Sequence, residues 1–115
     1  ILSEINIQGR AGIDPNLFKP QADYLLKVRG MSMRDAGILD GDLIAVNRTK
    51  SIRSGQIIVA RVNNEVTVKR FRRQANEVKL ISENPEFLTI HVDLKREQFE
   101  VEGLAVGVIR NGKIS

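Results

Sequence analysis

Ser32 stands in a sequence context that could present its hydroxyl as a nucleophile. It lies between the only two methionines of the chain, in Gly30-Met31-Ser32-Met33, after an extended run at residues 24–28 and before a glycine- and aspartate-rich turn at residues 35–42. A serine at the end of a strand can attack a carbonyl carbon when a base takes its proton. Serine is also an ordinary turn residue, so the functional interpretation depends on a base elsewhere in the chain.

The clearest structural unit of the sequence is a β-hairpin. Two largely apolar runs, 57–62 and 65–71, flank Asn63-Asn64. Asparagine tolerates the positive φ angles of a two-residue hairpin turn, and that turn puts Ile58 opposite Lys69. Both faces of the hairpin are largely apolar, so we expect it to lie centrally in the fold.

Lys69 is the candidate base because it does not fit the face that it is predicted to share with Thr67 and Phe71. An ammonium group there loses hydration, which lowers its pKa from the ordinary value of about 10.4. A neutral amine can then take the proton of a serine hydroxyl. The alternative is that Lys69 extends its amine to water at the edge of the sheet.

No other residue offers a comparable base. His91 is the only histidine, and no candidate nucleophile lies near it in Thr89-Ile90-His91-Val92-Asp93, which indicates a structural or surface role. The chain has no cysteine. A thiolate or histidine-rich metal site is therefore not expected, and proton transfer between a lysine and a serine needs no cofactor.

The composition predicts a mainly β fold. At 115 residues the chain is long enough for one compact domain, and its 4% of aromatic residues leave the core to Ile, Leu and Val, which favour strands. Residues 1–23 are predicted to form an irregular arm, anchored by Ile13, Leu17 and Phe18, before the domain proper at residues 24–115. The expected architecture is mostly antiparallel around the central hairpin. Strands are predicted at 24–28, 43–46, 57–62, 65–71, 78–81, 88–92, 99–101 and 104–109, with a turn at Asn111-Gly112 and no helix of normal length.

The charge invites a nucleic-acid interpretation. The net charge is +4, and much of the excess lies in Lys69-Arg70-Phe71-Arg72-Arg73. Bases stack on exposed aromatic rings, and only Phe71 lies near this charge. A basic, non-catalytic nucleic-acid binder is therefore kept as one alternative. No apolar run reaches the roughly 18 residues of a membrane span, so we expect no membrane association and a cytoplasmic location.

Taken together, the sequence resembles the catalytic domain of LexA-like SOS repressors. UmuD, phage repressors and bacterial signal peptidases share the serine–lysine motifs more loosely. The motifs that carry the resemblance are Gly30-Met31-Ser32-Met33, Glu65-Val66-Thr67-Val68-Lys69-Arg70, and residues 14–20, 37–46 and 102–112.

The resemblance implies a serine–lysine peptidase of signal-peptidase-like β architecture. Ser32 would be the nucleophile and Lys69 the general base. The backbone amides of Met31 and Ser32 would form the oxyanion hole. Thr67 would orient the lysine amine, and Glu65 would lie where the cleavable loop docks.

LexA-like repressors cut themselves at an Ala-Gly type bond when RecA on single-stranded DNA stimulates them. We expect the scissile bond and the helix-turn-helix domain that binds operator DNA to lie outside this chain, and we interpret Ala11-Gly12 as a coincidental dipeptide. The resemblance also implies a homodimer through the last strand, with Leu104, Val106 and Val108; a buried intramolecular strand is the alternative. A UmuD-like accessory protein of a lesion-bypass polymerase is the remaining alternative function.

Overall fold

The protein is a small β domain with very little helix. The computed structural model describes residues 3–6 and 13–111, and residues 3–6 through their backbone only. Two 3-10 helices, η1 (Pro15–Leu17) and η2 (Arg34–Ala36), are the helical elements of this described part, which contains no helix long and apolar enough to span a membrane. The strands are β1 (Ser3–Asn6), β2 (Tyr24–Lys27), β3 (Leu43–Asn47), β4 (Ile57–Val62), β5 (Glu65–Gln74), β6 (Glu77–Ile81), β7 (Ile90–Asp93) and β8 (Phe99–Ile109).

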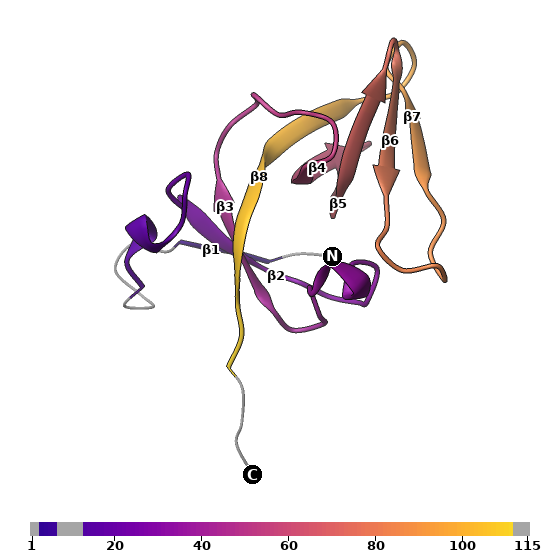
Figure 1. The fold of residues 1–115 in the computed structure, drawn as a ribbon. Coiled ribbons are helices and arrows are strands. Elements are labelled where there is room, and N and C mark those ends of the chain that lie inside the picture. The colour runs from indigo at the N-terminus through magenta and orange to yellow at the C-terminus, as the bar shows by residue number, and fades with distance from the viewer. Residues whose placement is uncertain (1–2, 7–12, 112–115) are drawn as a thin grey trace.

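All eight strands belong to one sheet in the order β1-β2-β3-β8-β4-β5-β6-β7. Every neighbouring pair is antiparallel, which confirms the predicted mainly β, antiparallel class. The predicted hairpin is β4–β5, and it lies inside the sheet rather than at an edge, as its two apolar faces indicated (Figure 1).

The hairpin register is also as predicted. Asn63 and Asn64 adopt φ angles of 48° and 72°, the left-handed conformation that a two-residue turn between twisted strands requires. The turn sets Val62 opposite Glu65, and Ile58 consequently lies opposite Lys69. Because side chains alternate with a period of two, this register decides which face of the sheet receives the lysine.

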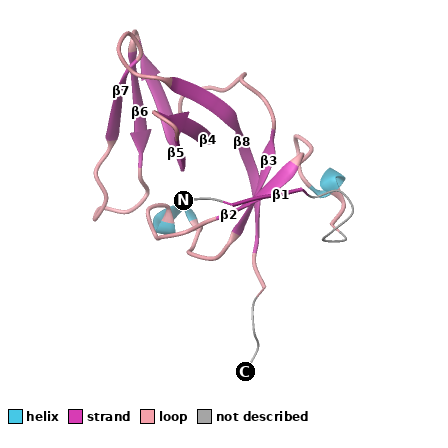
Figure 2. Cartoon of the chain, turned by 180° about the vertical axis from the view of Figure 1, so that it is seen from behind, coloured by secondary structure: helices cyan, strands magenta, loops and turns pink. Residues whose placement is uncertain are grey.

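The last strand differs from the prediction of two short strands at 99–101 and 104–109. It is one continuous strand, β8, whose first part pairs with β4 and whose second part pairs with β3. Its pairing slips by one residue opposite Val59/Ala60 and again opposite Ala45/Val46. Such bulges bend a strand, and in Figures 1 and 2 β8 curves from one half of the sheet into the other.

Gly103 explains why sequence reasoning split this strand. A glycine inside a run of β-branched residues is typical of an interruption. Here a Cβ at Gly103 would lie 2.5 Å from Val46 Cγ1 and 2.6 Å from the carbonyl oxygen of Asn47. The glycine therefore permits close approach of β3 and β8 rather than ending the strand.

The N-terminal segment is less irregular than predicted. Residues 3–6 form β1, which pairs with β2. Ile13 and Phe18 pack against a small cluster that contains Leu25, as expected of anchors, but Leu17 is 73% exposed and anchors nothing. Ala11-Gly12 and Gly112 of the predicted Asn111-Gly112 turn lie outside the described residues.

Two hydrophobic clusters include residues of β5, the strand that carries Lys69. One contains Met33 and Ile38 of the turn after β2, packed with Val59 and Val68 of the hairpin. The other lies over β4–β7 and includes Phe71. Burial of Met33 between strands therefore fixes the turn that carries Ser32 against the strand that carries Lys69.

Candidate active site

The turn that carries Ser32 is held from several sides. Gly30 has φ = 90°, a left-handed conformation that glycine adopts without strain, and its N–H donates to Asp40 Oδ1 at 2.6 Å. One residue beyond the serine, Met33 is 2% exposed and inserts into the core. Ser32 is therefore a half-buried residue of a turn whose next residue is a buried anchor.

Lys69 lies on β5 and is buried, with 8% of its surface exposed. It does not extend to water, so the alternative in which the amine reaches solvent at the sheet edge is wrong. Burial, rather than a charged neighbour, lowers the pKa of the Lys69 ammonium group below its ordinary value. The fraction of neutral amine at a given pH is correspondingly larger than for a lysine in water.

The structure brings Ser32, Lys69 and Thr67 together. Lys69 Nζ lies 3.1 Å from Ser32 Oγ, and it donates a hydrogen bond to Thr67 Oγ1 at 2.7 Å. Thr67 occupies the same strand face two residues before the lysine. With its hydrogens directed to the threonine, a neutral amine can aim its lone pair at the serine hydroxyl. This is the distance at which a base can take a proton from a nucleophile.

The backbone amides of Met31 and Ser32 have no partner in the described part of the chain: neither N–H donates to another protein group there. Exposed N–H groups beside a nucleophile are suited to bind an oxygen that gains negative charge during attack. The expected pair of oxyanion amides is therefore adjacent to the serine and unoccupied by protein acceptors.

Residues 1–106 match a protein-family model described as Peptidase S24-like. The chain belongs to the S24-like peptidase family. This is a family of serine peptidases that includes the self-cleaving LexA- and UmuD-type proteins. The match covers both Ser32 and Lys69 and extends from the N-terminal segment through most of β8.

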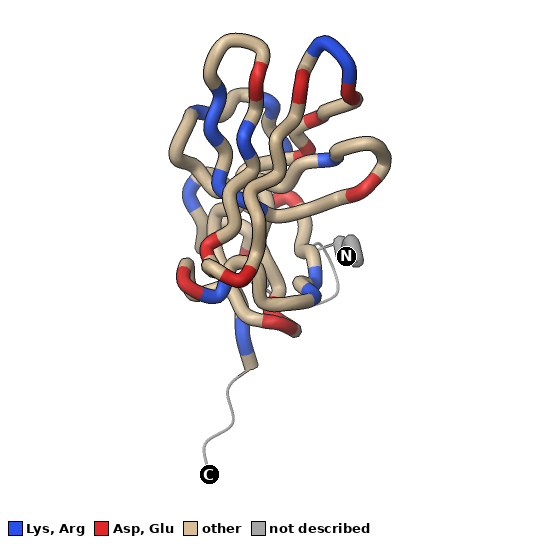
Figure 3. The backbone as a smooth tube through the Cα atoms, turned by 90° about the vertical axis from the view of Figure 1, so that its right-hand side faces the viewer, with Lys and Arg blue, Asp and Glu red and all other residues tan. Residues whose placement is uncertain are grey.

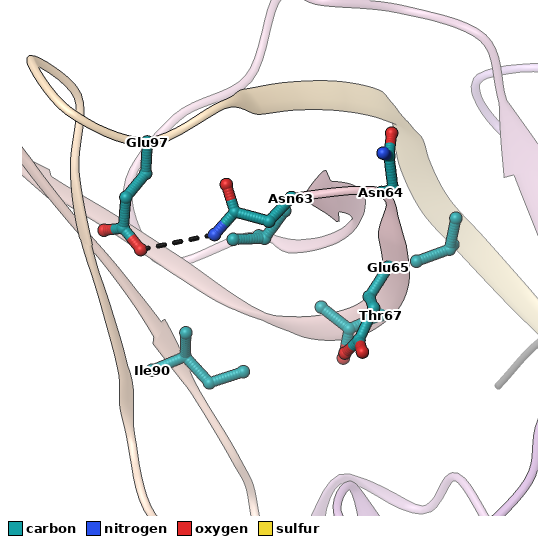
Figure 4. Close-up of a pocket in the computed structure, with 8 residues that line it drawn as sticks. Asn63, Asn64, Glu65, Thr67, Ile90 and Glu97 are labelled. Carbon is teal, nitrogen blue, oxygen red and sulfur yellow. Dashed lines mark hydrogen bonds between the residues drawn. The ribbon is translucent and has the colours of Figure 1, made fainter.

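The S24-like domain has a surface pocket along the first part of β5, lined by both Glu65 and Thr67. Its volume is about 850 Å³, and Ile90 and Glu97 lie on its opposite side (Figure 4). β6 pairs with β5 only from Arg70 onward, so the β5 backbone before that residue has one strand edge without a partner in the described chain. An extended peptide could add to that edge and run toward Ser32.

The basic cluster at residues 69–73 is exposed only at Arg72 and Arg73, and it lacks an exposed aromatic ring. Lys69 is buried, and Arg70 bonds to Glu83 and to the Gly55 carbonyl oxygen. Phe71 is 6% exposed and stacks on Phe99, with ring centroids 6.3 Å apart. The expected exposed aromatic ring is thus in the core. Along the chain trace, segments of both charges occur in the upper and the lower part of the domain (Figure 3).

The last strand is half-buried along most of its length, with Gly103 buried in its middle. Leu104 packs against the core beside β4 and β7, whereas Val108 is 40% exposed. Val106 is the bulge residue and packs near Phe18. The pairing with β4 ends at Leu104, so beyond it β8 has one edge with no strand partner in the described chain.

Sequence reasoning missed the residues that brace the serine turn. Asp42 is 2% exposed and accepts hydrogen bonds from the Arg110 guanidinium at 2.7 and 2.6 Å, while Arg110 also donates to the Gly37 carbonyl oxygen. Sequence reasoning placed Asp42 in a turn only, because no local pattern indicates a partner 68 positions away.

His91 is a surface residue, one of the two roles predicted for it, with its Nδ1 3.4 Å from Glu77 Oε2. Among the described residues, no three His, Asp or Glu side chains are grouped so that they could hold a metal ion.

Proposed function

We propose that this chain is the self-cleaving peptidase and dimerisation domain of a LexA-like transcriptional repressor of the SOS response to DNA damage. The observation that carries the proposal is the buried Lys69 amine at 3.1 Å from Ser32 Oγ. The peptide bond cut is of the Ala-Gly type, and RecA on single-stranded DNA stimulates the cut. Operator DNA is bound by a separate helix-turn-helix domain.

In the first step, neutral Lys69 takes the proton of Ser32, and Ser32 Oγ forms a bond to the carbonyl carbon of the substrate. The amides of Met31 and Ser32 bind the resulting oxyanion. When the C–N bond breaks, the Lys69 ammonium gives its proton to the leaving amine. Water then attacks the ester, Lys69 takes its proton, and Ser32 regains a hydrogen as the acid leaves. No cofactor enters this cycle.

The substrate is an extended segment that docks beside β5. The pocket lined by Glu65, Thr67 and Ile90, together with the unpaired edge of β5, supports this docking site. A segment there covers the small part of Lys69 that is still exposed, which favours its neutral form further.

The experiment is cleavage in trans. The chain is incubated with a LexA-like repressor whose own catalytic serine has been replaced, so that every cut comes from the added domain. We expect specific cleavage that is lost with Ser32→Ala and with Lys69→Ala. Cleavage by Lys69→Ala at the wild-type rate would refute the proposed base. A folded wild-type domain that never cuts would instead favour a UmuD-like role as a binding platform.

A further inference from the structure

The segment that follows β6 lies along the serine turn and holds it through its backbone and one side chain. Glu83 N–H donates to the Ser32 carbonyl oxygen at 2.9 Å, and Asp35 N–H donates to the Glu83 carbonyl oxygen at 2.8 Å. Asn84 Nδ2 donates to the Met31 carbonyl oxygen at 2.8 Å. Segment 83–84 therefore contacts the peptide groups on both sides of the serine Cα.

Asn84 is the only side chain in this contact, and its environment fixes its orientation. The residue is 4% exposed, and Asn84 Oδ1 accepts a hydrogen bond from Glu86 N–H at 3.0 Å. Because a backbone N–H can only donate, the atom facing Glu86 must be the oxygen of the amide. The NH₂ group consequently faces the Met31 carbonyl oxygen.

The Met31 carbonyl oxygen and the Ser32 N–H belong to one peptide group. In a trans peptide these two groups point in opposite directions. A hydrogen bond that holds the oxygen toward Asn84 therefore aims the Ser32 N–H away from it, on the side where it meets no protein acceptor in the described chain. The Met31 carbonyl oxygen also accepts a hydrogen bond from Arg34 N–H, at 3.2 Å, so the Asn84 bond is the shorter of the two that hold this peptide. Without it, only the longer bond within the turn would hold the orientation of the Ser32 N–H.

The same segment is tied to the strand of the base. The Glu83 carboxylate accepts a hydrogen bond from Arg70 Nε, and Arg70 directly follows Lys69 on β5. Segment 83–84 thus connects the serine turn to β5, the strand that carries Lys69. Within this segment, Asn84 contacts the peptide group between Met31 and Ser32.

We propose that Asn84 is a positioning residue for the oxyanion hole: its side-chain NH₂ group holds the Met31 carbonyl oxygen and so directs the Ser32 N–H at the oxyanion. This proposal rests on the proposed serine–lysine peptidase function. It adds a residue that never touches the substrate and acts only through the backbone of the serine turn.

The test uses Asn84→Ala, with Asn47→Ala as the matched control. Asn47 Nδ2 also donates to a backbone carbonyl oxygen at 2.8 Å, but its acceptor is Gln21, in the segment before β2 rather than in the serine turn. Loss of one oxyanion donor typically lowers kcat about 10²–10³-fold, and a misdirected donor should cost part of this. We expect Asn84→Ala to lower kcat about 10–100-fold with KM and the pH midpoint unchanged, and Asn47→Ala to leave kcat unchanged.

A second variant separates the two hydrogen bonds of the side chain. Asn84→Asp keeps the acceptor for Glu86 N–H and loses the donor to Met31, so it should lose kcat as Asn84→Ala does. Recovery of the wild-type kcat by Asn84→Asp would overturn the proposal. The hydrogen bond from Glu86 N–H to the side-chain oxygen, and not the donor to Met31, would then be what kcat requires.

The affinities of two ligands distinguish a positioning role of Asn84 from a purely structural one. A peptide aldehyde, which forms a tetrahedral adduct on Ser32, should lose affinity for Asn84→Ala, whereas an uncleaved peptide amide should bind as to wild type. Equal loss for both ligands would overturn the proposal, as would wild-type kcat in Asn84→Ala. Cleavage by Lys69→Ala at the wild-type rate would instead refute the peptidase mechanism itself.

Discussion

At the scale of single residues, the burial of Lys69 affects both the stability of the domain and the reactivity of the base. Its amine is buried with two hydroxyl oxygens as hydrogen-bond partners, and burial is the cause of its lowered pKa. A buried ammonium group is unfavourable, and this cost is what lowers the Lys69 pKa. The burial that lowers the pKa of Lys69 therefore also destabilises the folded domain at every pH at which the lysine of the unfolded chain is protonated.

The first prediction concerns the pH dependence of cleavage. Only neutral Lys69 can accept the Ser32 proton, so kcat should rise with pH and level off above the lowered pKa of Lys69. Lys69→Arg should be inactive throughout, because a guanidinium group keeps its proton. The measurement is kcat from pH 6 to 10, and a flat wild-type profile would contradict the role of Lys69.

The second prediction concerns stability. The unfolded chain binds more protons than the folded one between the lowered pKa of Lys69 and about 10.4, so its contribution to the unfolding free energy rises with pH in that window. Lys69→Met removes the buried amine and should stabilise the domain by about 1–2 kcal/mol at pH 7.

Urea unfolding of wild type and Lys69→Met at pH 7 and at pH 10 measures this effect. The advantage of the methionine variant should shrink at the higher pH. An advantage that is equal at both pH values would show that packing, rather than charge, is its cause.

At the scale of secondary-structure elements, two hairpins use different turn chemistry. Asn63-Asn64 joins β4 to β5, and its residue types made both the turn and the register predictable. In the next hairpin, Ala75 adopts φ = 54° between β5 and β6. Alanine does not favour this conformation, so its local sequence carried no signal for the turn.

The third prediction follows from that turn. Ala75→Gly should raise the unfolding free energy by about 0.5–1 kcal/mol, because glycine adopts positive φ without the steric cost that alanine bears. Thermal unfolding of the variant measures the change. Val62→Gly, in the β4 strand, is the opposite control and should destabilise the domain.

The fourth prediction concerns the ion pair between the end of β8 and the serine turn. The Arg110 guanidinium holds the pKa of the Asp42 carboxyl below its usual range. The pair therefore stabilises the fold above the unfolded pKa of about 3.9 and is lost as the pH falls through the lowered value. Arg110→Gln should lower the melting temperature at pH 7.

This difference from wild type should shrink as the pH falls through the lowered pKa of Asp42, because the carboxyl then gains its proton in the wild type as well. The measurement is the melting temperature of both proteins at pH 7 and at a series of acidic pH values. A deficit that persists unchanged in acid would mean that Arg110 stabilises through its other bond, to the Gly37 carbonyl oxygen.

At the scale of the whole molecule, β8 connects the two halves of the sheet and still leaves one edge open beyond Leu104 in the described chain. The fifth prediction is that this edge pairs with a second copy across a two-fold axis. Val108→Asp should then shift the protein toward monomer, since it would place carboxylates near one another in the dimer.

Sedimentation equilibrium of wild type and variant tests this dimer. Leu88→Asp is the matched control, because Leu88 is 90% exposed and belongs to the loop before β7 rather than to β8. A wild-type protein that remains monomeric at high micromolar concentration would refute the dimer.

Sequence reasoning worked where the signal was local. The strand positions and the burial of Lys69 follow from alternation and a two-residue turn, both of which can be read within about fifteen residues. The partners of Met31 and Asp42 could not be predicted, because Asn84 and Arg110 reach them across 53 and 68 positions. The order of the strands in the sheet could not be predicted for the same reason. β8 lies between β3 and β4, and nothing in its composition indicates this position.

The order of these partners along the chain has a consequence for biosynthesis. Lys69 follows Ser32 by 37 positions, and Asn84 and Arg110 follow their partners by 53 and 68. A ribosome-bound chain that has just exposed Ser32 therefore has neither its proton acceptor nor the braces of its turn. We expect its hydroxyl to stay inert toward neighbouring nascent chains until translation of nearly the whole domain is complete, so that the order of synthesis itself protects a growing chain from premature cutting.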